Sequence, residues 1–361
     1  MRRRIIVAMS GGVDSSVAAA LLAERGHEVL GVGLRFPDVP DSAARSSCCG
    51  MAGMEDARAV AGELGIPFYV LDYRDAFDEA VIAPFCEAYA SGETPNPCIP
   101  CNTELKFGRL LALARALGVD HVATGHYARV ESDGRSGAPR LWRGMDKAHD
   151  QSYFLYSLTR EQLAYALFPV GEMTKVQVRE VARRQGLDVA AKPSSQDICF
   201  VGEEGYRALV AAREPAGAEP GPILDARGHT LGTHQGLAGY TVGQRRGLGI
   251  AAAEPLYVTG LDPERNAVLV GPRAETRTRS VRVGKVHWLG DVCPANAIVL
   301  DVQTRYRTAA VAATLQWNGD VADVEFAEPQ PRVAAGQAVV FYEDDRVLGG
   351  GIAQAVSTAA Y

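Results

Sequence analysis

Residues 9–16 form a short glycine-rich stretch whose residue types and spacing could bind a phosphate group. The stretch lies between an apolar run, 5–8, and a helix-like run, 17–22. Gly11 and Gly12 let the backbone approach a phosphate without a Cβ in the way, and the N–H groups that open a helix point at the anion. Further hydroxyl donors come from Ser10, Ser15 and Ser16. No Gly-Lys-Ser/Thr sequence closes the loop, so it is not a Walker A motif, but the whole pattern predicts nucleotide binding.

Two cysteines at CxxC spacing form the second group that could do chemistry. Cys98 and Cys101 lie among prolines just before a predicted helix. We expect Cys101 at the start of that helix, where the pKa of a thiol is lowered and the thiolate is favoured, so Cys101 is a candidate nucleophile. Structural zinc is the alternative, but zinc would need two more nearby Cys or His ligands. Cys199 follows Asp197 in a polar loop, a pattern that alone favours a buried cysteine over a catalytic one.

The elements that must position these residues alternate between apolar runs and helical stretches over residues 5–125. Predicted strands cover 5–8, 28–34, 68–71 and 121–124, and predicted helices cover 55–64, 77–90, 107–117 and 177–185. This alternation is typical of a parallel sheet with helices on both faces. Ligands bind such sheets at the carboxyl ends of the strands. We therefore expect the glycine-rich loop, Leu34 and residues 125–127 to converge on one cleft.

The pattern changes after the parallel-sheet region. Residues 206–275 contain short strands and glycine-rich turns, and residues 276–361 alternate β-branched runs with Gly and Asp, which predicts an antiparallel barrel. We predict an α/β fold with three domains: a parallel-sheet nucleotide-binding domain at 1–205, a small β-rich central domain at 206–275, and a C-terminal antiparallel β-barrel at 276–361.

Composition narrows the class of protein. The chain has 361 residues, enough for two or three cores. Its net charge of −6 means that a nucleic-acid partner would have to be held by local basic clusters. Candidate basic residues are Arg179, Arg183, Arg184, Lys192, Arg245, Arg246, Arg273, Arg277, Arg279 and Arg282.

Location follows from what the sequence does not contain. No apolar run approaches the roughly 18 residues of a membrane span, and the apolar run after the first arginines is too short for an export signal. The seven unevenly spaced cysteines do not resemble a secreted disulfide framework. We expect a cytoplasmic protein with no membrane partner.

Several long motifs together resemble a known family. They are SGGVDSS (10–16), TPNPCIPCN (94–102), ATGHYAR (123–129), DQSYFL (150–155), KPSSQDICF (192–200), GYTVGQRRGLG (239–249) and RYR (305–307). The first resembles the loop of the PP-loop ATP pyrophosphatases, which cleave ATP between the α and β phosphates. The full set, in this order, resembles the bacterial tRNA-specific 2-thiouridylases, which replace the C2 oxygen of the wobble uridine of certain tRNAs with sulfur.

The resemblance implies a role for particular residues. The ATP-binding positions would be Ala8, Met9, Ser10, Gly11, Gly12, Val13, Asp14 and Ser15, with Leu34 and Gly125 lining the adenosine pocket. Cys101 would be the nucleophile, and Cys199 would carry a persulfide. Asp14 would orient Mg²⁺ or a phosphate-bound water, or merely cap its helix. The tRNA contacts would be Asn96, Pro97, Cys98, His126, His149, Asp150, Gln151, Arg305, Tyr306 and Gln337. The resemblance also implies two cofactors, ATP and Mg²⁺. The implied partners are tRNA and an upstream sulfur donor, either a cysteine desulfurase or a sulfur relay protein.

Three positions depart from the common pattern of the family. Leu34 replaces a frequent Met and His149 a frequent Lys, while Cys98 stands where many members have Asp. With this third cysteine, Cys98, Cys101 and Cys199 could ligate a 4Fe–4S cluster that holds the sulfur as sulfide. The persulfide and cluster routes both remain open at this point.

Two other functions compete with tRNA thiolation. One is another PP-loop adenylating enzyme, and the other is a non-catalytic RNA-binding or sulfur-carrier module. An intact glycine-rich loop together with Cys101 favours the thiolating enzyme. Cys48 and Cys49 are adjacent thiols in a Ser-rich loop, to which no role is assigned.

Overall fold

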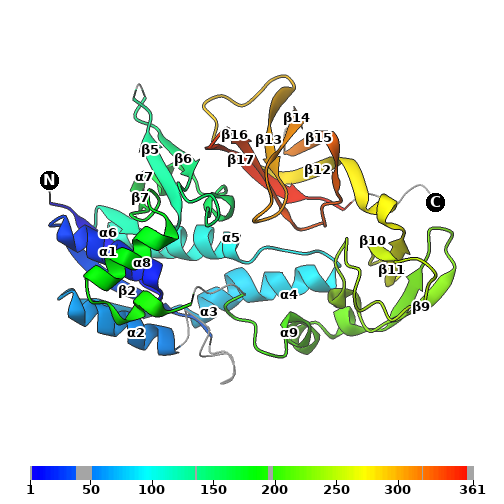
Figure 1. Cartoon of the computed structure of the whole chain (residues 1–361), viewed down its shortest axis with the longest axis horizontal. Helices are drawn as coiled ribbons and strands as arrows, with labels where there is room; N and C mark the ends of the chain where they lie inside the picture. Colours follow the sequence, from blue (N-terminus) through cyan, green and yellow to red (C-terminus); the bar gives the residue numbers. More distant parts are fainter. Residues whose placement is uncertain (1, 38–50, 135, 194–197, 319, 356–361) are drawn as a thin grey trace. The chain divides into compact units, whose positions relative to one another are not determined.

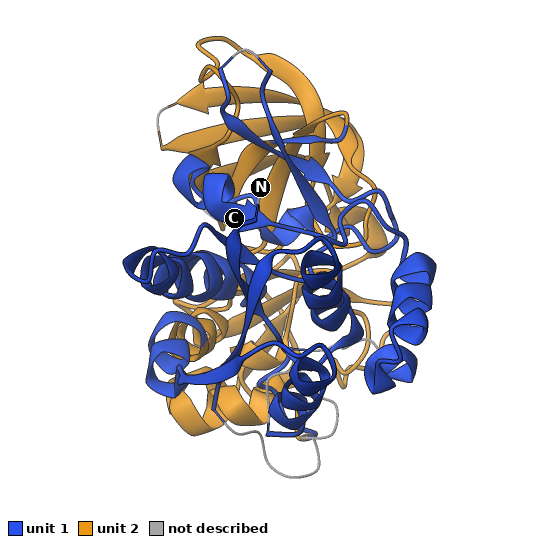
Figure 2. Ribbon diagram, turned by 90° about the vertical axis from the view of Figure 1, so that its left-hand side faces the viewer, with its two compact units in different colours: residues 1–81, 97–203, 345–347 blue, residues 82–96, 204–344, 348–361 orange. Residues whose placement is uncertain are grey.

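The computed structural model describes residues 2–37, 51–134, 136–193, 198–318 and 320–355 (Figure 1). The chain divides into two compact units (Figure 2). Unit 1 consists of residues 1–81, 97–203 and 345–347, and unit 2 consists of residues 82–96, 204–344 and 348–361. The short stretch 82–96 therefore belongs with the C-terminal part of the chain, which the sequence pattern did not indicate.

Unit 1 is built on a five-stranded parallel sheet in the order β3-β2-β1-β4-β7. Its strands are β1 (Arg4–Ala8), β2 (Glu28–Arg35), β3 (Phe68–Asp72), β4 (His121–Ala123) and β7 (Ala166–Leu167). The central strand β1 is apolar because both of its faces are covered, and Ile5 and Val7 have no exposed surface. Unit 1 also contains the antiparallel hairpin β5 (Ala128–Ser132) and β6 (Pro139–Arg143). The predicted parallel-sheet region is confirmed.

Helices alternate with the strands of unit 1. They are α1 (Val13–Glu24), α2 (Met51–Glu63), α3 (Arg74–Phe77), α5 (Cys98–Pro100), α6 (Leu110–Ala116), α7 (Arg160–Tyr165) and α8 (Lys175–Arg184), with the 3₁₀ turns η3 (Ser152–Phe154) and η4 (Asp188–Ala191) and the π-helices η1 (Asp78–Ile82) and η2 (Cys101–Arg109). The helix predicted over 107–117 actually begins at Cys98 and runs through η2 into α6. Its first turn tolerates Pro100, because a backbone N–H there has no partner inside the helix.

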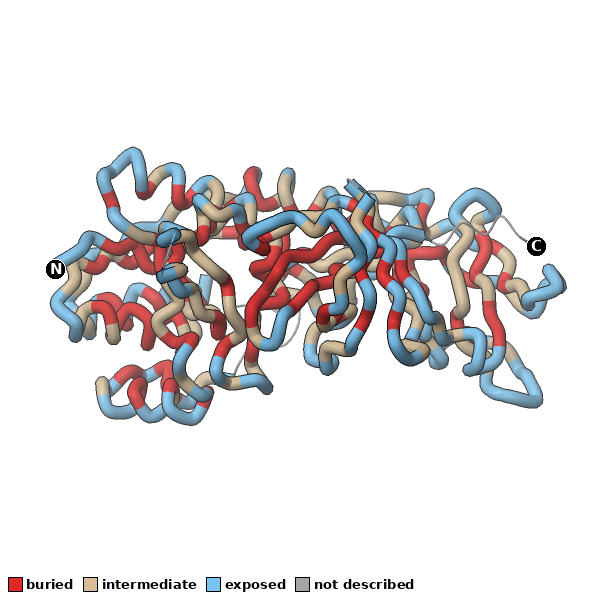
Figure 3. The backbone as a smooth tube through the Cα atoms, turned by 90° about the horizontal axis from the view of Figure 1, so that it is seen from above, coloured by how far each residue is buried: buried red, intermediate tan, exposed pale blue. Residues whose placement is uncertain are grey.

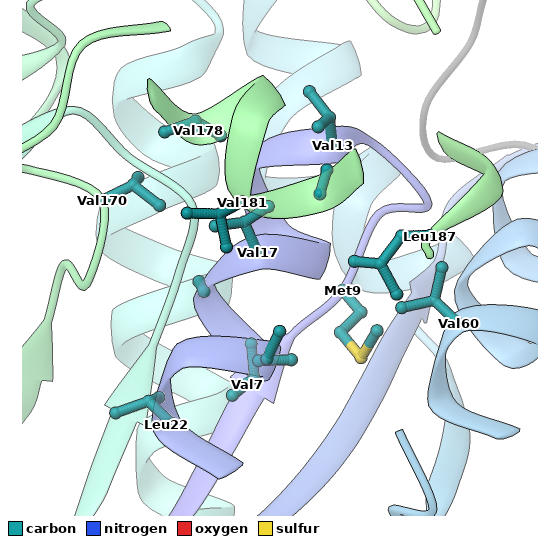
Figure 4. Close-up of a cluster of buried hydrophobic side chains, with 14 of the residues drawn as sticks. Val7, Met9, Val13, Val17, Leu22, Val60, Val170, Val178, Val181 and Leu187 are labelled. Carbon is teal, nitrogen blue, oxygen red and sulfur yellow. The ribbon is translucent and has the colours of Figure 1, made fainter. Parts of the chain in front are cut away.

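The core of unit 1 encloses α1 on several sides. Figure 4 shows Val17 of α1 next to Val181 of α8, and Val13 and Val178 belong to the same hydrophobic cluster. Because α1 carries apolar side chains all round, it forms a buried helix between the sheet and α8. This packing fixes the glycine-rich loop, which leads directly into α1.

Unit 2 contains a four-stranded sheet and a closed barrel. The sheet has the order β10-β11-β8-β9, and the six-stranded antiparallel barrel closes through pairing of β12 with both β15 and β17. The strands are β8 (Gly221–Leu224), β9 (Thr230–His234), β10 (Tyr257–Asp262), β11 (Ala267–Gly271), β12 (Arg277–Trp288), β13 (Ile298–Gln303), β14 (Val311–Asn318), β15 (Val321–Pro331), β16 (Ala338–Glu343) and β17 (Arg346–Ala353). The helices are α4 (Ala83–Ala90), α9 (Tyr206–Arg213), η5 (Pro215–Ala218), η6 (Leu237–Gly239) and η7 (Arg273–Thr276).

The sheet and the barrel have separate hydrophobic cores. In the barrel, β16 and β17 are buried at nearly every position (Figure 3). The predicted fold class, a parallel-sheet domain followed by a small β-rich part and a C-terminal antiparallel barrel, is confirmed. The predicted boundaries at 205 and 275 remain a prediction: the first lies near the passage between units at 203, and the second falls within unit 2.

Among the described residues, no helix has both the length and the apolar character that crossing a membrane requires.

Candidate active site

The glycine-rich loop joins β1 to α1, and its backbone geometry requires glycine at one position. Gly11 has a φ of 71°, and a Cβ there would lie 2.1 Å from the carbonyl oxygen of Gly53. The loop is also tied to the neighbouring strand, because the N–H of Met9 donates to the carbonyl of Val32 at 2.8 Å. Gly11 therefore keeps the turn narrow and leaves its backbone N–H groups near the start of α1, as a phosphate site needs.

The serine hydroxyls of the loop are not equivalent. Ser16 is fully buried and donates to the carbonyl of Gly12 at 2.9 Å. Ser15 is also buried, and its Oγ accepts from the N–H of Ser10 at 3.2 Å. The hydroxyl of Ser15 also donates to the carbonyl of Gly12, at 3.2 Å, so the expectation that all three serines offer donors to a phosphate is wrong for both Ser15 and Ser16.

Asp14 does not cap α1, and its half-buried side chain is paired within unit 1. The N-cap position is Gly12, without a side-chain cap. The carboxylate of Asp14 accepts from the hydroxyl of Tyr127 at 2.7 Å and pairs with Nζ of Lys175, which lies 2.7 Å from each of its oxygens. Tyr127 and Lys175 are both buried. The capping role considered for Asp14 is wrong, since the carboxylate is engaged by a buried phenol and a buried ammonium.

The end of β4 lies directly against the loop. A Cβ at Gly125 would be 2.5 Å from the backbone nitrogen of Ser15, so only glycine fits this approach. Leu34 is buried near the end of β2, the strand beside β1. Parallel strands end at the same edge of a sheet, and the structure brings Gly125 against the loop there, as the sequence predicted for the ATP-binding residues. Their binding of ATP stays a prediction.

His126 follows Gly125 and is a neutral imidazole. Its Nδ1 lies 2.7 Å from the hydroxyl of Thr124. Burial, together with the nearby charge of Lys106, holds the pKa of His126 well below the ordinary value. His126 thus offers a hydrogen bond at neutral pH and no positive charge to a nucleic-acid phosphate.

Cys101 lies inside a helical run and not at its start. The run begins at Cys98, and the N–H of Cys101 donates to the carbonyl of Pro97 at 3.3 Å. Cys98 is exposed and Cys101 is buried. Cys101 therefore lies in the first turn of the helical run and opens η2, close to the predicted helix start, and the run itself starts three residues earlier because its first turn accommodates Pro100.

The segment after Cys101 is a π-helix, η2, which the sequence did not reveal. Asn102 donates from its side chain to the carbonyl of Phe154 at 3.1 Å and accepts from Nζ of Lys106 at 3.0 Å. A Cβ at Gly108 would lie 2.8 Å from the carbonyl oxygen of Thr103, so this register needs glycine there. Short π-helical segments are frequent at functional sites, and this one carries the candidate nucleophile.

Cys199 is half-buried and belongs to unit 1, as Cys101 does. The next residue, Phe200, packs edge-on against Phe77 with 5.6 Å between ring centroids. Asp197, like Cys48 and Cys49, lies outside the described residues. The nucleophile and persulfide roles of the two cysteines stay predictions.

The donor set does not fit an iron–sulfur cluster. Within the described part of the chain, which includes Cys98, Cys101 and Cys199, no three His, Cys, Asp or Glu side chains gather as a metal site requires. The tentative assignment of these cysteines as iron ligands therefore gains no support from their arrangement.

The predicted tRNA-contacting residues occur in both units. Unit 1 holds Pro97, Cys98, His126, His149, Asp150 and Gln151, and unit 2 holds Asn96, Arg305, Tyr306 and Gln337.

Asp150 has a structural task in unit 1. It is buried, and its carboxylate accepts from Arg143 at 2.9 Å, from the N–H of Gly144 at 2.9 Å and from the hydroxyl of Ser152 at 2.9 Å. Pro97 is buried too. In unit 2, Gln337 donates to the carbonyl of Thr94 at 2.7 Å. These bonds hold the polypeptide in place, and direct RNA contact by these residues stays a prediction.

Arg305 lies on an exposed turn. Its carbonyl accepts from the side chains of Gln303 and Thr308. Arg307 has a φ of 63° and places its guanidinium 5.3 Å from the ring centroid of Tyr306. The turn is thus a constrained, basic and aromatic surface element, a combination that suits RNA phosphates and bases.

Several of the candidate basic residues have partners within the chain, and two of these, Arg179 and Lys192, belong to unit 1. Arg179 donates to the carbonyls of Ala190 and Lys192, and Lys192 donates to the carbonyl of Gly11 at 3.2 Å and contacts Asp56. Lys192 therefore braces the glycine-rich loop.

Sequence reasoning missed the roles of Tyr127, Lys175 and Lys192. Tyr127 lies in the ATGHYAR motif, which marked the segment but not the partner. Lys175 follows Thr174, whose capping box with Gln177 signals a helix start. Nothing local could show that Lys175 contacts a residue far away in the sequence.

Comparison with known proteins gives matches along most of the chain. Family models described as "tRNA methyl transferase HUP domain", "tRNA methyl transferase PRC-barrel domain" and "Aminomethyltransferase beta-barrel domain" match residues 3–203, 213–272 and 278–353. The chain is 50% identical over 359 residues to the tRNA-specific 2-thiouridylase MnmA of Moorella thermoacetica, covering 98% of this chain and 99% of that one. It is also 50% identical over 358 residues to the protein of that name from Methylorubrum extorquens, covering 96% and 92%.

Solved structures are more distant. A 4-thiouridine synthetase in complex with RNA and ATP is 16% identical, with a TM-score of 0.35, over 55% of this chain and 45% of that one.

Proposed function

The chain belongs to the tRNA-specific 2-thiouridylase family, and from this premise we propose that it uses ATP to replace the C2 oxygen of the wobble uridine of tRNA with sulfur. The protein is then a tRNA-uridine 2-sulfurtransferase that, like other PP-loop enzymes, cleaves ATP between the α and β phosphates. The observation that carries the proposal is the approach of Gly125 to the glycine-rich loop: a Cβ at Gly125 would lie 2.5 Å from the backbone nitrogen of Ser15, so the chain after β4 presents backbone and no side chain to the loop.

Adenylation is the first step that the proposal requires. Uracil O2 attacks the α-phosphorus of ATP, the bond between the α and β phosphates breaks, and pyrophosphate leaves. The oxygen at C2 then becomes part of an AMP ester, which is a good leaving group where oxide is not. The loop N–H groups at the start of α1 stabilise the departing pyrophosphate.

Mg²⁺, bound together with the nucleotide, would neutralise part of the phosphate charge. Asp14 already pairs with Lys175, so we do not assign it as a metal ligand. The nucleotide's own oxygens would hold the ion.

Sulfur transfer follows by the persulfide route. The terminal sulfur of a Cys199 persulfide attacks C2, and AMP leaves. The thiolate of Cys101 then attacks the sulfur of Cys199, the sulfur–sulfur bond breaks, and its electron pair stays on the RNA as the thiocarbonyl. A Cys101–Cys199 disulfide remains, and a thiol reductant must return both residues to thiols before a sulfur donor reloads Cys199.

The persulfide route is favoured over the cluster route because of the donor set. The cluster route needs Cys98, Cys101 and Cys199 together as ligands, and the described residues contain no such group. Two-cysteine chemistry needs only Cys101 and Cys199 and no third ligand. Two further features of the proposal, a cytoplasmic location and an upstream cysteine desulfurase or sulfur relay protein as the sulfur donor, remain predictions.

Nucleoside mass spectrometry tests the proposal directly. Unmodified tRNA is incubated anaerobically with the protein, ATP, Mg²⁺, a thiol reductant, and a cysteine desulfurase with cysteine as the donor of persulfide sulfur, and is then digested. We expect an ATP-dependent gain of 2-thiouridine, which Cys101→Ser and Cys199→Ser each abolish without weakening ATP binding. ATP cleavage without thiouridine would overturn the proposal and point to another adenylated substrate.

Two further cysteine variants make this test specific. Cys293 is exposed in unit 2, and Cys293→Ser is the matched control that should keep full activity. Cys98→Ser separates the two sulfur routes, because near-full activity excludes a three-cysteine cluster, while loss of both activity and bound iron supports one.

A further inference from the structure

Tyr127 links Asp14 of the glycine-rich loop to the segment that contains Gln151. Its hydroxyl donates to Asp14 Oδ1 at 2.7 Å. Its backbone N–H donates to Oε1 of Gln151 at 3.0 Å, and its carbonyl accepts from the N–H of Gln151 at 2.8 Å. Tyr127 is buried, so its ring cannot turn away without disturbing the core.

Lys175 forms a second link between Asp14 and the same segment. Its Nζ pairs with both oxygens of Asp14, and its backbone N–H donates to Asp146 Oδ2 at 2.8 Å. That oxygen of Asp146 also accepts from Nδ1 of His149 at 3.0 Å. The ammonium of Lys175 lies 5.6 Å from the ring centroid of Tyr127, so the two links are in contact with each other.

The packing beneath the links is rigid. Lys175 is the first residue of α8, one turn before Val178, and Asp14 is one turn before Val17 in α1. Because α1 and α8 pack through these valines, the ammonium and the carboxylate have little freedom to separate by moving their helices (Figure 4). A change in the contacts of Asp14 must therefore come from movement of side chains or of residues 146–151.

We propose that Tyr127 and Lys175 are positioning residues that couple the Asp14 carboxylate of the phosphate loop to RNA bound at His149 and Gln151. This inference rests on the proposed function, because RNA contact by these two residues is part of it. An RNA phosphate or base that takes a hydrogen bond from His149 or Gln151 removes that bond from Asp146 or Tyr127. The interactions that Tyr127 and Lys175 make with Asp14 then change, and with them the affinity of the loop for ATP. By linkage, ATP changes the affinity for RNA by the same factor.

The test measures this coupling by binding alone. The dissociation constant of α,β-methylene ATP, which cannot be cleaved between those phosphates, is determined with and without saturating unmodified tRNA. In the wild-type protein tRNA should tighten binding by about fivefold or more. We call the dissociation constant without tRNA divided by that with tRNA the coupling ratio. In Tyr127→Phe and Lys175→Met this ratio should fall toward one, while the affinity for tRNA in the absence of the nucleotide stays within about twofold of the wild-type value.

Matched controls remove the same groups elsewhere in unit 1. Tyr69→Phe deletes a phenol hydroxyl on an exposed tyrosine, and Arg115→Met removes a surface cation that pairs with Glu161. Both should keep the wild-type ratio. Lys175→Arg, which keeps the charge, should restore part of the ratio that Lys175→Met loses.

Several results would overturn the inference. The inference is wrong if the wild-type ratio is near one or if both variants keep the wild-type ratio. It is also wrong if the variants lose affinity for the nucleotide and for tRNA equally while the ratio stays the same, because that result indicates a purely structural role. If Lys175→Met does not fold, Tyr127→Phe, which lacks one oxygen atom, decides the question. Failure of the proposed function shows differently, as absence of thiouridine from the wild-type protein whatever the ratio.

Discussion

At the scale of single residues, His126 shows how burial alters the chemistry of a side chain that the sequence presents as a basic candidate. It follows Gly125, the residue packed against the phosphate loop, and its Nδ1 is hydrogen-bonded to Thr124. Desolvation and the charge of Lys106 lower the pKa of this half-buried imidazole and keep it neutral, so we expect His126 to contact RNA by hydrogen bonding and not by charge.

The lowered pKa of His126 predicts a pH dependence of stability. The unfolded chain takes up a proton near pH ~6.5, but the folded protein does so only at a lower pH. Below pH ~6.5 the unfolded state therefore binds more protons, and the free energy of unfolding falls as the pH falls, by at most about 1.4 kcal/mol per pH unit for this group.

Urea unfolding at about pH 7.5 and about pH 5.5 measures this effect. His126→Gln cannot take up the proton, so it should lose about 1 kcal/mol less than the wild-type protein between the two pH values. His121, whose pKa is also lowered by burial and by the charge of Arg3, leaves part of the dependence in place. Equal losses in the two proteins would contradict the assignment.

At the scale of elements, the π-helix η2 determines which way Cys101 and Asn102 face. A π-helix makes a wider turn than an α-helix, and here Gly108 lies opposite the carbonyl of Thr103. The apolar spacing of the sequence indicates a helix here but cannot distinguish the two helix types. Tertiary bonds, such as that from Asn102 to Phe154, accompany the wider turn.

Gly108→Ala should disturb η2, because the new Cβ would lie 2.8 Å from Thr103 O. We expect a loss of about 1–3 kcal/mol in the free energy of unfolding, and a drop in the thiolation rate of up to about a hundredfold from the displaced Cys101. Chemical unfolding and single-turnover thiolation measure the two effects.

Gly62→Ala is the matched control for this substitution. Gly62 is an exposed helical glycine in α2 with nothing within 4 Å of its ideal Cβ. The variant should therefore gain a few tenths to about 1 kcal/mol of stability from helix propensity and keep full activity. The interpretation of η2 would be contradicted if Gly108→Ala behaved like Gly62→Ala.

At the scale of the whole molecule, the sequence predicts well what depends on local pattern. The strands of the parallel sheet follow from apolar runs such as 5–8, and the phosphate loop follows from two glycines at a strand–helix junction. The barrel follows from alternating β-branched runs. These features need no knowledge of distant partners, because periodicity and turn chemistry encode them.

Contacts between distant segments could not be predicted in this way. Two examples are the ion pair of Lys175 with Asp14 and the hydrogen bond from Lys192 to the carbonyl of Gly11, which join residues far apart in the chain. A third is the stretch 82–96, which belongs to unit 2 with residues much later in the sequence. Cys101 shows the same limit on a smaller scale: two flanking prolines suggested a loop, and the first turn of a helix accommodates them.

The charge of the whole chain constrains how it binds RNA. With a net charge of −6, the chain cannot rely on general attraction, so each phosphate contact must come from a particular basic side chain. A basic residue in the sequence does not by itself provide a phosphate contact. The guanidinium of Arg282, for example, pairs with the carboxylate of Asp323 at 3.1 Å. Arg305 is exposed on its constrained turn beside the Arg307–Tyr306 contact.

Salt titrations of tRNA binding should therefore separate these two arginines. Removing a residue that neutralises one phosphate reduces the slope of log affinity against log salt concentration by about 0.7–0.9. We expect this reduction, with weaker binding at low salt, for Arg305→Ala and an unchanged slope for Arg282→Ala, since the latter removes a charge already balanced by a carboxylate. Equal slopes for the two variants would mean that the exposed turn takes no part in phosphate binding, and the basic contacts would then have to be sought among the other arginines of unit 2.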